Sequence, residues 1–367
     1  MKVLNISLEK KLFEASSKSR QRVLGYSRLF NRFDLIVLTG RGYKVLEFPN
    51  MNIYPTNSWG KAFYLSDGYF LGKKIIKKYS YDIISAQDPF EAGFIAWLLA
   101  KKYKIKLQIQ IHGDYFGSCY WRKENLLNGA RYYLGRFIVK KADSIRVVSN
   151  RTKDSLVKLG LAPDKITVAP IFSAISDQQS AISGKRNSER FIFLTVGRLV
   201  KVKNINLQIE AMAEVVKKYP ATELWVVGDG PERKNYELRI TNYGLEKKIK
   251  MLGWKSNLDE YYHQADVFIL TSNYEGWSLS AIEAASFGLP IIMTDVGCAG
   301  EIIKNNESGI VIPVGGRETL QKAMVELTEN KELRKKLGSN ALAAVSGLPG
   351  QEQSWQLYKE SLEKAFK

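Results

Sequence analysis

The chain has few of the residues on which covalent cross-links and metal sites depend. Its 367 residues include only two cysteines, Cys119 and Cys298, and two histidines, His112 and His263. Two cysteines cannot form a disulfide framework and are typical of proteins kept in a reducing compartment. Four such ligands, far apart in the sequence, do not readily supply a structural zinc site. We therefore expect no disulfides and no structural zinc, and a cytoplasmic location.

Long apolar runs are also missing. No stretch approaches the ~18 uninterrupted apolar residues of a membrane span. The run 3–6 is too short for a secretory signal and has no cleavage site after it. Hydrophobic residues at 45% and charged residues at 25% are typical of a soluble globular protein rather than a disordered one. A length of 367 residues is long for a single core, so two domains are expected.

Acidic residues are scarce in the first half of the chain. Residues 1–170 hold 30 Lys and Arg but only 13 Asp and Glu, which accounts for +17 of the net charge of +18. Such a one-sided field attracts an anionic membrane surface, a phosphate-bearing lipid acceptor or nucleic acid, although plain solubility is an alternative. The segments 73–78 and 121–141 mix the cations with aromatic residues. That mixture suits an anionic interface, and equally a helix whose aromatics face the core.

Short apolar runs alternate with amphipathic helical patterns throughout. Strands are expected at 3–8, 35–39, 83–86, 107–111 and 144–148, and again at 191–196, 223–227, 249–252, 267–270, 291–293 and 309–312. Strands separated by helices predict βαβ units, and two such series predict two doubly wound, Rossmann-like α/β domains. We place the first domain at 1–170, a Ser-rich linker at 171–190, the second domain at 191–347 and a final helical segment at 348–367 that packs back on the first domain.

Two strand ends of the second half carry polar or glycine-rich turns. Arg198 and Lys203 follow the strand 191–196, where ligands of doubly wound sheets bind. A diphosphate there would be held by Arg198 as a bidentate fork and by Lys203 as a point charge, although a solvated loop is the alternative. Gly228 and Gly230 form a tight strand-to-helix turn, which we interpret as structural because a lone G-x-G is a weak nucleotide signal.

Two acids, Glu275 and Glu283, stand eight residues apart around a predicted loop and helix start. Gly276 permits close backbone approach, and Ser278 or Ser280 is expected to cap the helix, whose free N–H groups form an anion site. The helix is apolar on most sides, so Glu283 is expected to be buried or site-facing rather than an ordinary exposed acid. Two carboxylates of this kind can accept hydrogen bonds from two points of one hydroxylated ligand.

The runs VGRL…KN, VVGDGPE and EGWSLSAIEAASFGLPII resemble the retaining glycosyltransferases of family four, whose fold is GT-B, with two Rossmann-like domains facing a cleft. The resemblance covers the whole second domain in order and spacing. It implies that Arg198 and Lys203 hold the donor diphosphate, and that Glu283 contacts the ribose and Glu275 the transferred sugar. It also implies contacts from Gly276, Trp277, Ser278 and Leu279. No metal or other cofactor is implied, because basic side chains and helix dipoles neutralise the leaving diphosphate.

The first domain matches this family less well. Relatives often carry a Gly-Gly loop after the first strand, but the segment 9–22 contains no glycine. We expect Ser17, Ser19, Arg20 and Arg22 to supply contacts to the acceptor or a phosphate there; the alternative is a basic first helix turn.

The strand end at 111–114 resembles the active-site histidine loop of the same family. His112 is then a catalytic residue near the donor sugar, and Asp114 is a candidate for acceptor or phosphate contact; a structural histidine is the alternative. Asp88, after another strand, is expected either to meet the acceptor or to cap the next helix. Relatives often have His where Gln87 stands.

The expected function is transfer of a hexosyl unit from a UDP- or GDP-sugar to an acceptor hydroxyl, with retention, in cell-envelope or lipid-linked glycan synthesis. The enzyme is expected in the cytoplasm, peripheral at the inner face of the cell membrane through its basic first domain. One alternative is a GT-B relative with other sugar-nucleotide chemistry, such as an epimerase. Another is a basic nucleic-acid-binding protein, which would leave Glu275, Glu283 and the glycine turns unexplained, so no nucleic acid is expected.

Overall fold

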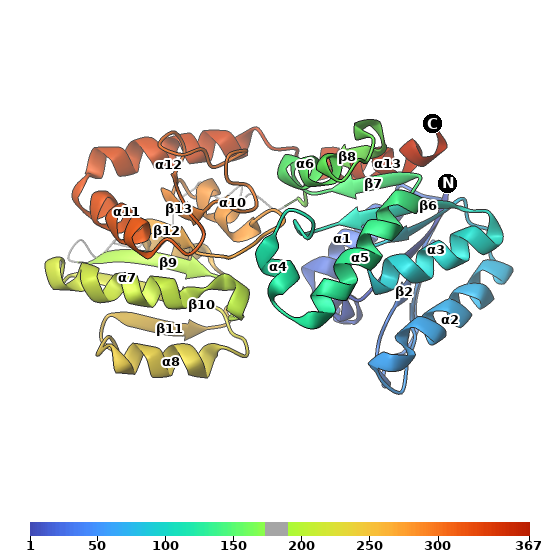
Figure 1. Cartoon of the computed structure of the whole chain (residues 1–367), viewed down its shortest axis with the longest axis horizontal. Helices are drawn as coiled ribbons and strands as arrows, with labels where there is room; N and C mark the ends of the chain where they lie inside the picture. Colours follow the sequence, from blue (N-terminus) through green and yellow to red (C-terminus); the bar gives the residue numbers. More distant parts are fainter. Residues whose placement is uncertain (173–189) are drawn as a thin grey trace. The chain divides into compact units, whose positions relative to one another are not determined.

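A computed structural model describes residues 1–172 and 190–367 of the chain, so most of the predicted linker 171–190 lies outside the described residues. The chain divides into two compact units (Figure 1). The first domain consists of Met1–Ile171 together with Pro349–Lys367, and the second domain consists of Phe172–Leu348. Each is a mainly parallel sheet covered by helices, which confirms the predicted pair of doubly wound α/β domains.

The sheet of the first domain has the strand order β3-β4-β2-β1-β5-β6-β7-β8. All pairs are parallel except β3 with β4. The strands are β1 (Lys2–Ser7), β2 (Arg32–Val37), β3 (Leu46–Phe48), β4 (Met51–Pro55), β5 (Ile83–Ala86), β6 (Lys106–Ile111), β7 (Ser144–Val147) and β8 (Ile166–Val168). Strands β3, β4 and β8 were not predicted from the sequence, because they include partly exposed or exposed residues instead of forming a continuous apolar run.

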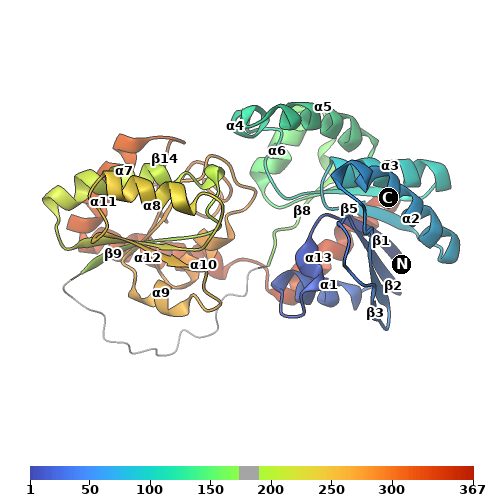
Figure 2. The same cartoon turned by 90° about the horizontal axis from the view of Figure 1, so that it is seen from below.

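Helices cover both faces of this sheet (Figure 2). One face carries α2 (Tyr64–Lys78), α3 (Glu91–Tyr103), α5 (Leu126–Lys141) and α6 (Asn150–Lys158), and the other carries α1 (Lys18–Ser27) and α13 (Gln351–Glu363). The strands are apolar on both sides: Leu35 of β2 packs in the core beneath α1 and α13, whereas its neighbour Ile36 packs in the core beneath α2 and α3. Asn125 caps α5, since its side chain accepts a hydrogen bond from Asn128 N–H, and the short helix α4 (Cys119–Lys123) precedes it.

The C-terminal helix α13 packs on the first domain, as predicted. Tyr358 is fully buried and stacks on Tyr26 of α1, with 4.2 Å between ring centroids. A side chain at Gly25 would lie 2.2 Å from the ring of Trp355, so only glycine fits there. Ser361 accepts a hydrogen bond of 3.1 Å from Gln108 of β6. The last residues of the chain therefore complete the core that the first residues begin.

The second domain has a parallel sheet in the order β11-β10-β9-β12-β13-β14. Its strands are β9 (Phe191–Val196), β10 (Thr222–Val227), β11 (Ile249–Gly253), β12 (Val267–Leu270), β13 (Ile291–Thr294) and β14 (Ile310–Ile312). Its helices are α7 (Ile205–Lys218), α8 (Arg233–Asn242), α9 (Asp259–Gln264), α10 (Leu279–Ser286), α11 (Arg317–Glu329) and α12 (Lys331–Ser346). No helix within the described residues of either domain is long and apolar enough to cross a membrane.

Candidate active site

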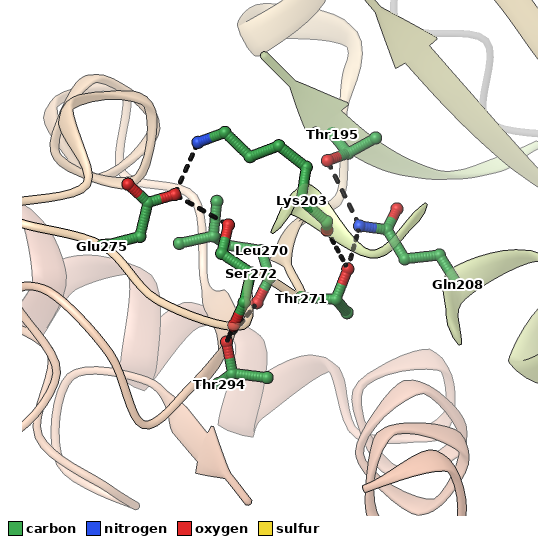
Figure 3. A network of polar contacts seen from close by, with 8 residues as sticks. All are labelled: Thr195, Lys203, Gln208, Leu270, Thr271, Ser272, Glu275 and Thr294. Atoms are coloured by element: carbon green, nitrogen blue, oxygen red, sulfur yellow. Dashed lines mark hydrogen bonds and ion pairs between the residues drawn. The ribbon is translucent and has the colours of Figure 1, made fainter. Parts of the chain in front are cut away.

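Lys203 and Glu275 meet at the carboxyl edge of the second sheet. Lys203 ends a 3-10 turn after β9, and its Nζ lies 2.5 Å from Oε1 of Glu275, which stands in the loop after β12 (Figure 3). Ser272 donates its hydroxyl to the same oxygen at 2.7 Å. The Lys203 side chain passes Gly197, where an added Cβ would lie 3.6 Å from its Cε. Lys203 and Glu275, which were both predicted as site residues, are 72 positions apart in the sequence. The structure brings them together.

Arg198, the other predicted diphosphate ligand, is arranged differently. The residue is exposed and directly follows Gly197. Its side chain forms no ion pair or hydrogen bond with the residues that the structure describes. A solvated arginine at the edge of the sheet keeps all of its donors for a ligand.

A network of buried hydrogen bonds fixes the turn that carries Lys203 (Figure 3). Gln208 of α7 donates its Nε2 to Thr271 Oγ1 at 2.8 Å and to Thr195 Oγ1 at 3.3 Å. Thr271 donates in turn to the carbonyl of Lys203 at 3.0 Å, and Thr294 donates to the carbonyl of Ser272 at 2.6 Å. This network was not predicted from the sequence, although each of the neighbouring strands β9, β12 and β13 has a threonine within one residue of its end.

The Gly228–Gly230 turn packs against the same loop. Gly228 has φ +139°, and an added Cβ would lie 1.9 Å from the carbonyl oxygen of Gly197. A Cβ on Gly230 would lie 2.3 Å from the carbonyl oxygen of Leu199. The Leu199 amide donates to the carbonyl of Asp229 at 2.9 Å. These glycines allow two backbone segments to touch and so fix the position of the loop that carries Arg198 and Lys203.

Ser278 precedes helix α10 in a left-handed conformation, with φ 69° and ψ 59°. The expected serine cap is wrong: the Ser278 side chain accepts no hydrogen bond from the helix, and Ser280 lies within it. The residue is 4% exposed, and its Oγ is buried without a partner among the described residues. Gly297 lies close to this hydroxyl, since a Cβ added at 297 would be 2.2 Å from Oγ of Ser278. Backbone strain and an unpaired hydroxyl at one residue are features that gather at functional sites.

Glu283 lies one turn into α10 and is held separately from the Lys203–Glu275 pair. Its Oε2 accepts a hydrogen bond of 3.2 Å from the hydroxyl of Tyr262 on α9. Tyr262 is buried and stacks on Phe287 with ring centroids 5.0 Å apart. Burial, together with the charge of Glu283, raises the pKa of Tyr262, so the phenol stays protonated and donates. Glu283 is only partly exposed, as expected from its apolar neighbours.

His112 follows β6 in the first domain. Its Nε2 lies 2.8 Å from Oε1 of Gln87, and Gln87 Nε2 donates to Asn5 Oδ1 at 3.4 Å. Burial, with the positive charges of Arg146 and Arg22, lowers the pKa of His112 to about 3. The lowered pKa favours the neutral form of the ring at ordinary pH.

The glycine-free segment 9–22 ends in a capped helix start. Ser17 accepts a hydrogen bond of 3.1 Å from the amide of Arg20 and so caps α1. The structure places the neighbouring cations apart: the Arg20 guanidinium lies 5.3 Å from the ring centre of Phe48, whereas Arg22 is close enough to His112 to act on its ionisation. Ser19 lies between them on the first turn of α1 and is partly exposed.

The two aspartates predicted to meet the acceptor make local contacts. Asp114 Oδ1 accepts from Ser155 Oγ of α6 at 2.7 Å and from Gly117 N at 3.0 Å, which ties the histidine loop to that helix. Asp88 Oδ1 accepts from Phe90 N at 2.7 Å, and the amide of Ala92 in the first turn of α3 also acts on this carboxylate, so Asp88 lies at the start of that helix. Burial raises the pKa of Asp88 to about 6.

Comparison with known proteins covers both domains. Residues 177–343 match the family model described as Glycosyl transferases group 1, and residues 27–172 match the one described as Glycosyltransferase Family 4. The chain is 27% identical to the alpha-monoglucosyldiacylglycerol synthase of Acholeplasma laidlawii, over 72% of this chain and 71% of the relative. It is 29% identical to the UDP-Gal:alpha-D-GlcNAc-diphosphoundecaprenol alpha-1,3-galactosyltransferase of Escherichia coli, over 71% and 70%.

Solved structures confirm the GT-B fold. Anabaena HepE in complex with UDP superposes with a TM-score of 0.78 at 17% identity, covering 99% of this chain and 100% of that one. Sucrose-phosphate synthase from Thermosynechococcus elongatus gives a TM-score of 0.82 at 20% identity, covering 98% and 99%.

Proposed function

Because the chain belongs to the glycosyltransferases of family four, we propose that it moves a hexosyl unit from a nucleotide-diphosphate sugar to an acceptor hydroxyl with retention of anomeric configuration. The observation that carries this proposal is the Lys203–Glu275–Ser272 cluster beside the exposed Arg198. Lys203 has three N–H donors and shares one with Glu275, so the others are available to phosphate oxygens.

The leaving diphosphate gains negative charge as the bond to the sugar breaks. Arg198 and Lys203 stabilise that charge together with the free amides at the start of α10, beyond the left-handed Ser278. Glu275 orients the sugar, and Glu283, fixed by Tyr262, accepts from the ribose hydroxyls. We propose that this set of cations and amides works without a metal or other cofactor, so activity should survive treatment with EDTA.

The donor is proposed to be a UDP- or GDP-sugar. The name of the E. coli relative specifies UDP-galactose, and the HepE structure holds UDP, which favours uridine. Thermal-shift screening against UDP-, GDP-, ADP- and CMP-sugars tests this choice, because a ligand that binds the native state raises Tm. NMR of the product formed from the selected donor then reads the anomeric configuration. Product with inverted configuration would overturn the retaining assignment.

The acceptor is proposed to be lipid-linked or part of the cell envelope, since the relatives are named for diacylglycerol and diphosphoundecaprenol substrates. Helix α5 offers a surface for such a membrane: Leu126 is 97% and Tyr133 70% exposed, and Lys140 and Lys141 follow on a helix without acidic residues. Exposed apolar side chains among cations bind an anionic interface. We infer peripheral attachment of the first domain there.

Sedimentation with vesicles tests this attachment. The chain should sediment with phosphatidylglycerol-containing vesicles and not with neutral ones, and Lys140→Glu with Lys141→Glu should weaken binding. The matched control is Lys335→Glu with Lys336→Glu, two exposed lysines of α12 in the nearly neutral second domain. Equal loss of binding in both pairs, or no binding by the wild type, removes the membrane from the proposal.

A further inference from the structure

One face of the first sheet is polar where it meets α13. Successive side chains of a strand point to opposite faces, and on this face the apolar residues give way to Ser85 of β5, Gln108 and Gln110 of β6 and Arg146 of β7. All four are buried. A buried arginine is usually paired with a carboxylate, but Arg146 forms no ion pair with any residue that the structure describes. Neutral groups alone surround its charge.

Arg146 lies between the two points where the chain leaves and re-enters the first domain. Its Nε and one terminal nitrogen donate to the carbonyl of Ala169 at 3.2 and 2.9 Å, just before the chain passes into the second domain. Its other terminal nitrogen donates to Oε1 of Gln110 at 2.9 Å. The guanidinium also lies 5.1 Å from the ring centre of Tyr358 on α13, the first helix after the chain returns.

A continuous path of hydrogen bonds leads from Gln110 into α13. The Gln110 amide donates to Ser85 Oγ at 2.9 Å and to the Tyr358 hydroxyl at 3.3 Å. Ser85 donates to Gln108 Oε1 at 3.0 Å, and Gln108 donates to Ser361 Oγ at 3.1 Å. Ser361 ends the path by donating to the carbonyl of Tyr358 at 2.6 Å. Each member therefore donates to the next one along the path.

The arginine sets the direction of this path. A guanidinium has donors but no acceptor, so Gln110 must turn its carbonyl oxygen toward Arg146 and its NH2 group toward Ser85. Buried hydrogen bonds that point in one direction polarise and strengthen one another. An apolar side chain would be cheaper to bury than a cation among neutral groups, so Arg146 is suited to fixing a conformation rather than to adding stability.

We propose that Arg146 couples the two connections between the domains: the docked helix α13 and the segment that ends at Ala169 form one hydrogen-bonded unit and open together. A force on either connection is then shared by both, and α13 does not separate from the sheet alone. The coupling lies wholly within the first domain and does not rest on the proposed function.

Hydrogen exchange of the full chain, followed by mass spectrometry, tests the coupling. The amide of Ala169 donates to the carbonyl of Val147 at 2.9 Å, so its exchange reports opening of this segment. Arg146→Met removes the charge and the donors, and exchange should rise by about 10- to 100-fold both in α13 and at 166–171. Helix α2, on the opposite face, should stay within about twofold. A rise in only one of the two segments, or an equal rise in α2, overturns the proposal.

Two buried serines of α13 separate the path from the rest of the helix. Ser361 ends the path, whereas Ser354 donates to the carbonyl of Pro349 at 3.3 Å, outside it. Ser361→Ala should speed exchange at 166–171 by about 3- to 10-fold, and Ser354→Ala by less than about twofold. In the Arg146→Met background, Ser361→Ala should no longer change exchange there. An equal response to both serines, or a Ser361 effect that persists without the arginine, overturns the coupling.

Discussion

The two domains share an α/β architecture, but different kinds of contact hold the loops at the carboxyl edges of their sheets. In the second domain, glycines at 228, 230 and 297 let backbone segments touch, and the paired Lys203 and Glu275 stand on loops fixed by those contacts. In the first domain, the corresponding loop has no glycine, and side-chain amides and arginines around His112 shape the edge instead. One edge is held by close backbone contacts that leave no room for a Cβ at 228 and 230, and the other by contacts between side chains.

The largest expected effect is a loss of stability at the edge of the second sheet, where backbone segments touch. Gly228→Ala places a methyl group 1.9 Å from the Gly197 carbonyl, at a φ of +139°. We expect the free energy of unfolding of the second domain to fall by about 3 kcal/mol or more. Gly244→Ala is the control, because its φ is +65° but nothing lies within 4 Å, and about 1 kcal/mol is expected there. Urea unfolding followed by circular dichroism measures both; equal losses would contradict the close-packed turn.

Lys203→Ala tests the chemistry of the same edge. Losing one charge-assisted donor to the leaving group should lower kcat by about 10²- to 10³-fold. Lys201→Ala, an exposed lysine in the same 3-10 turn, should remain near wild type. Steady-state kinetics with the selected donor compare the two, and a Lys203 variant as active as the Lys201 variant would break the assignment.

Substitutions of Arg20 and Arg22 test the glycine-free segment 9–22 of the first domain. Arg22 acts on His112, whereas the guanidinium of Arg20 packs over Phe48. Arg22→Ala should therefore lower kcat/KM by about tenfold, the cost of roughly one exposed charge-assisted contact, and Arg20→Ala should change it less than about twofold. If neither variant alters donor or acceptor kinetics, this segment is only a basic first turn of α1.

The smallest expected effect concerns Asp88. Its pKa rises from 3.8 to about 6 in the folded state, so the ionised carboxylate destabilises the fold. Wild-type stability should therefore fall relative to Asp88→Asn as pH rises from 4 to 6, and the difference should then stay constant. Thermal unfolding at pH 4 and pH 8 should show the variant gaining a few degrees in Tm only at the higher pH. A gain already present at pH 4 would rule out the carboxylate as the cause.

The sequence was most informative where periodicity is long or a strand is buried on both faces. The strands Ile83–Ala86, Phe191–Val196 and Val267–Leu270 were located to the residue, because short, mainly apolar runs buried on both faces stand out from their polar flanks. The pair Lys203 and Glu275 could be predicted because strand ends of a parallel sheet converge. The hydrogen bonds from Gln208, Tyr262 and Gln87 could not, since each joins residues whose distance depends on helix packing rather than on local pattern.

The placement of helix α13 has a consequence for synthesis of the chain. Tyr358 and Leu362 are wholly buried in the first domain, against side chains of α1 and β2. On the ribosome, residues 1–171 emerge before the second domain, yet the face of their sheet that α1 and α13 share stays only partly covered while the entire second domain is made. The first domain is thus completed only after the second domain has been made, and its nascent apolar surface must be kept from aggregating until residues 349–367 leave the exit tunnel.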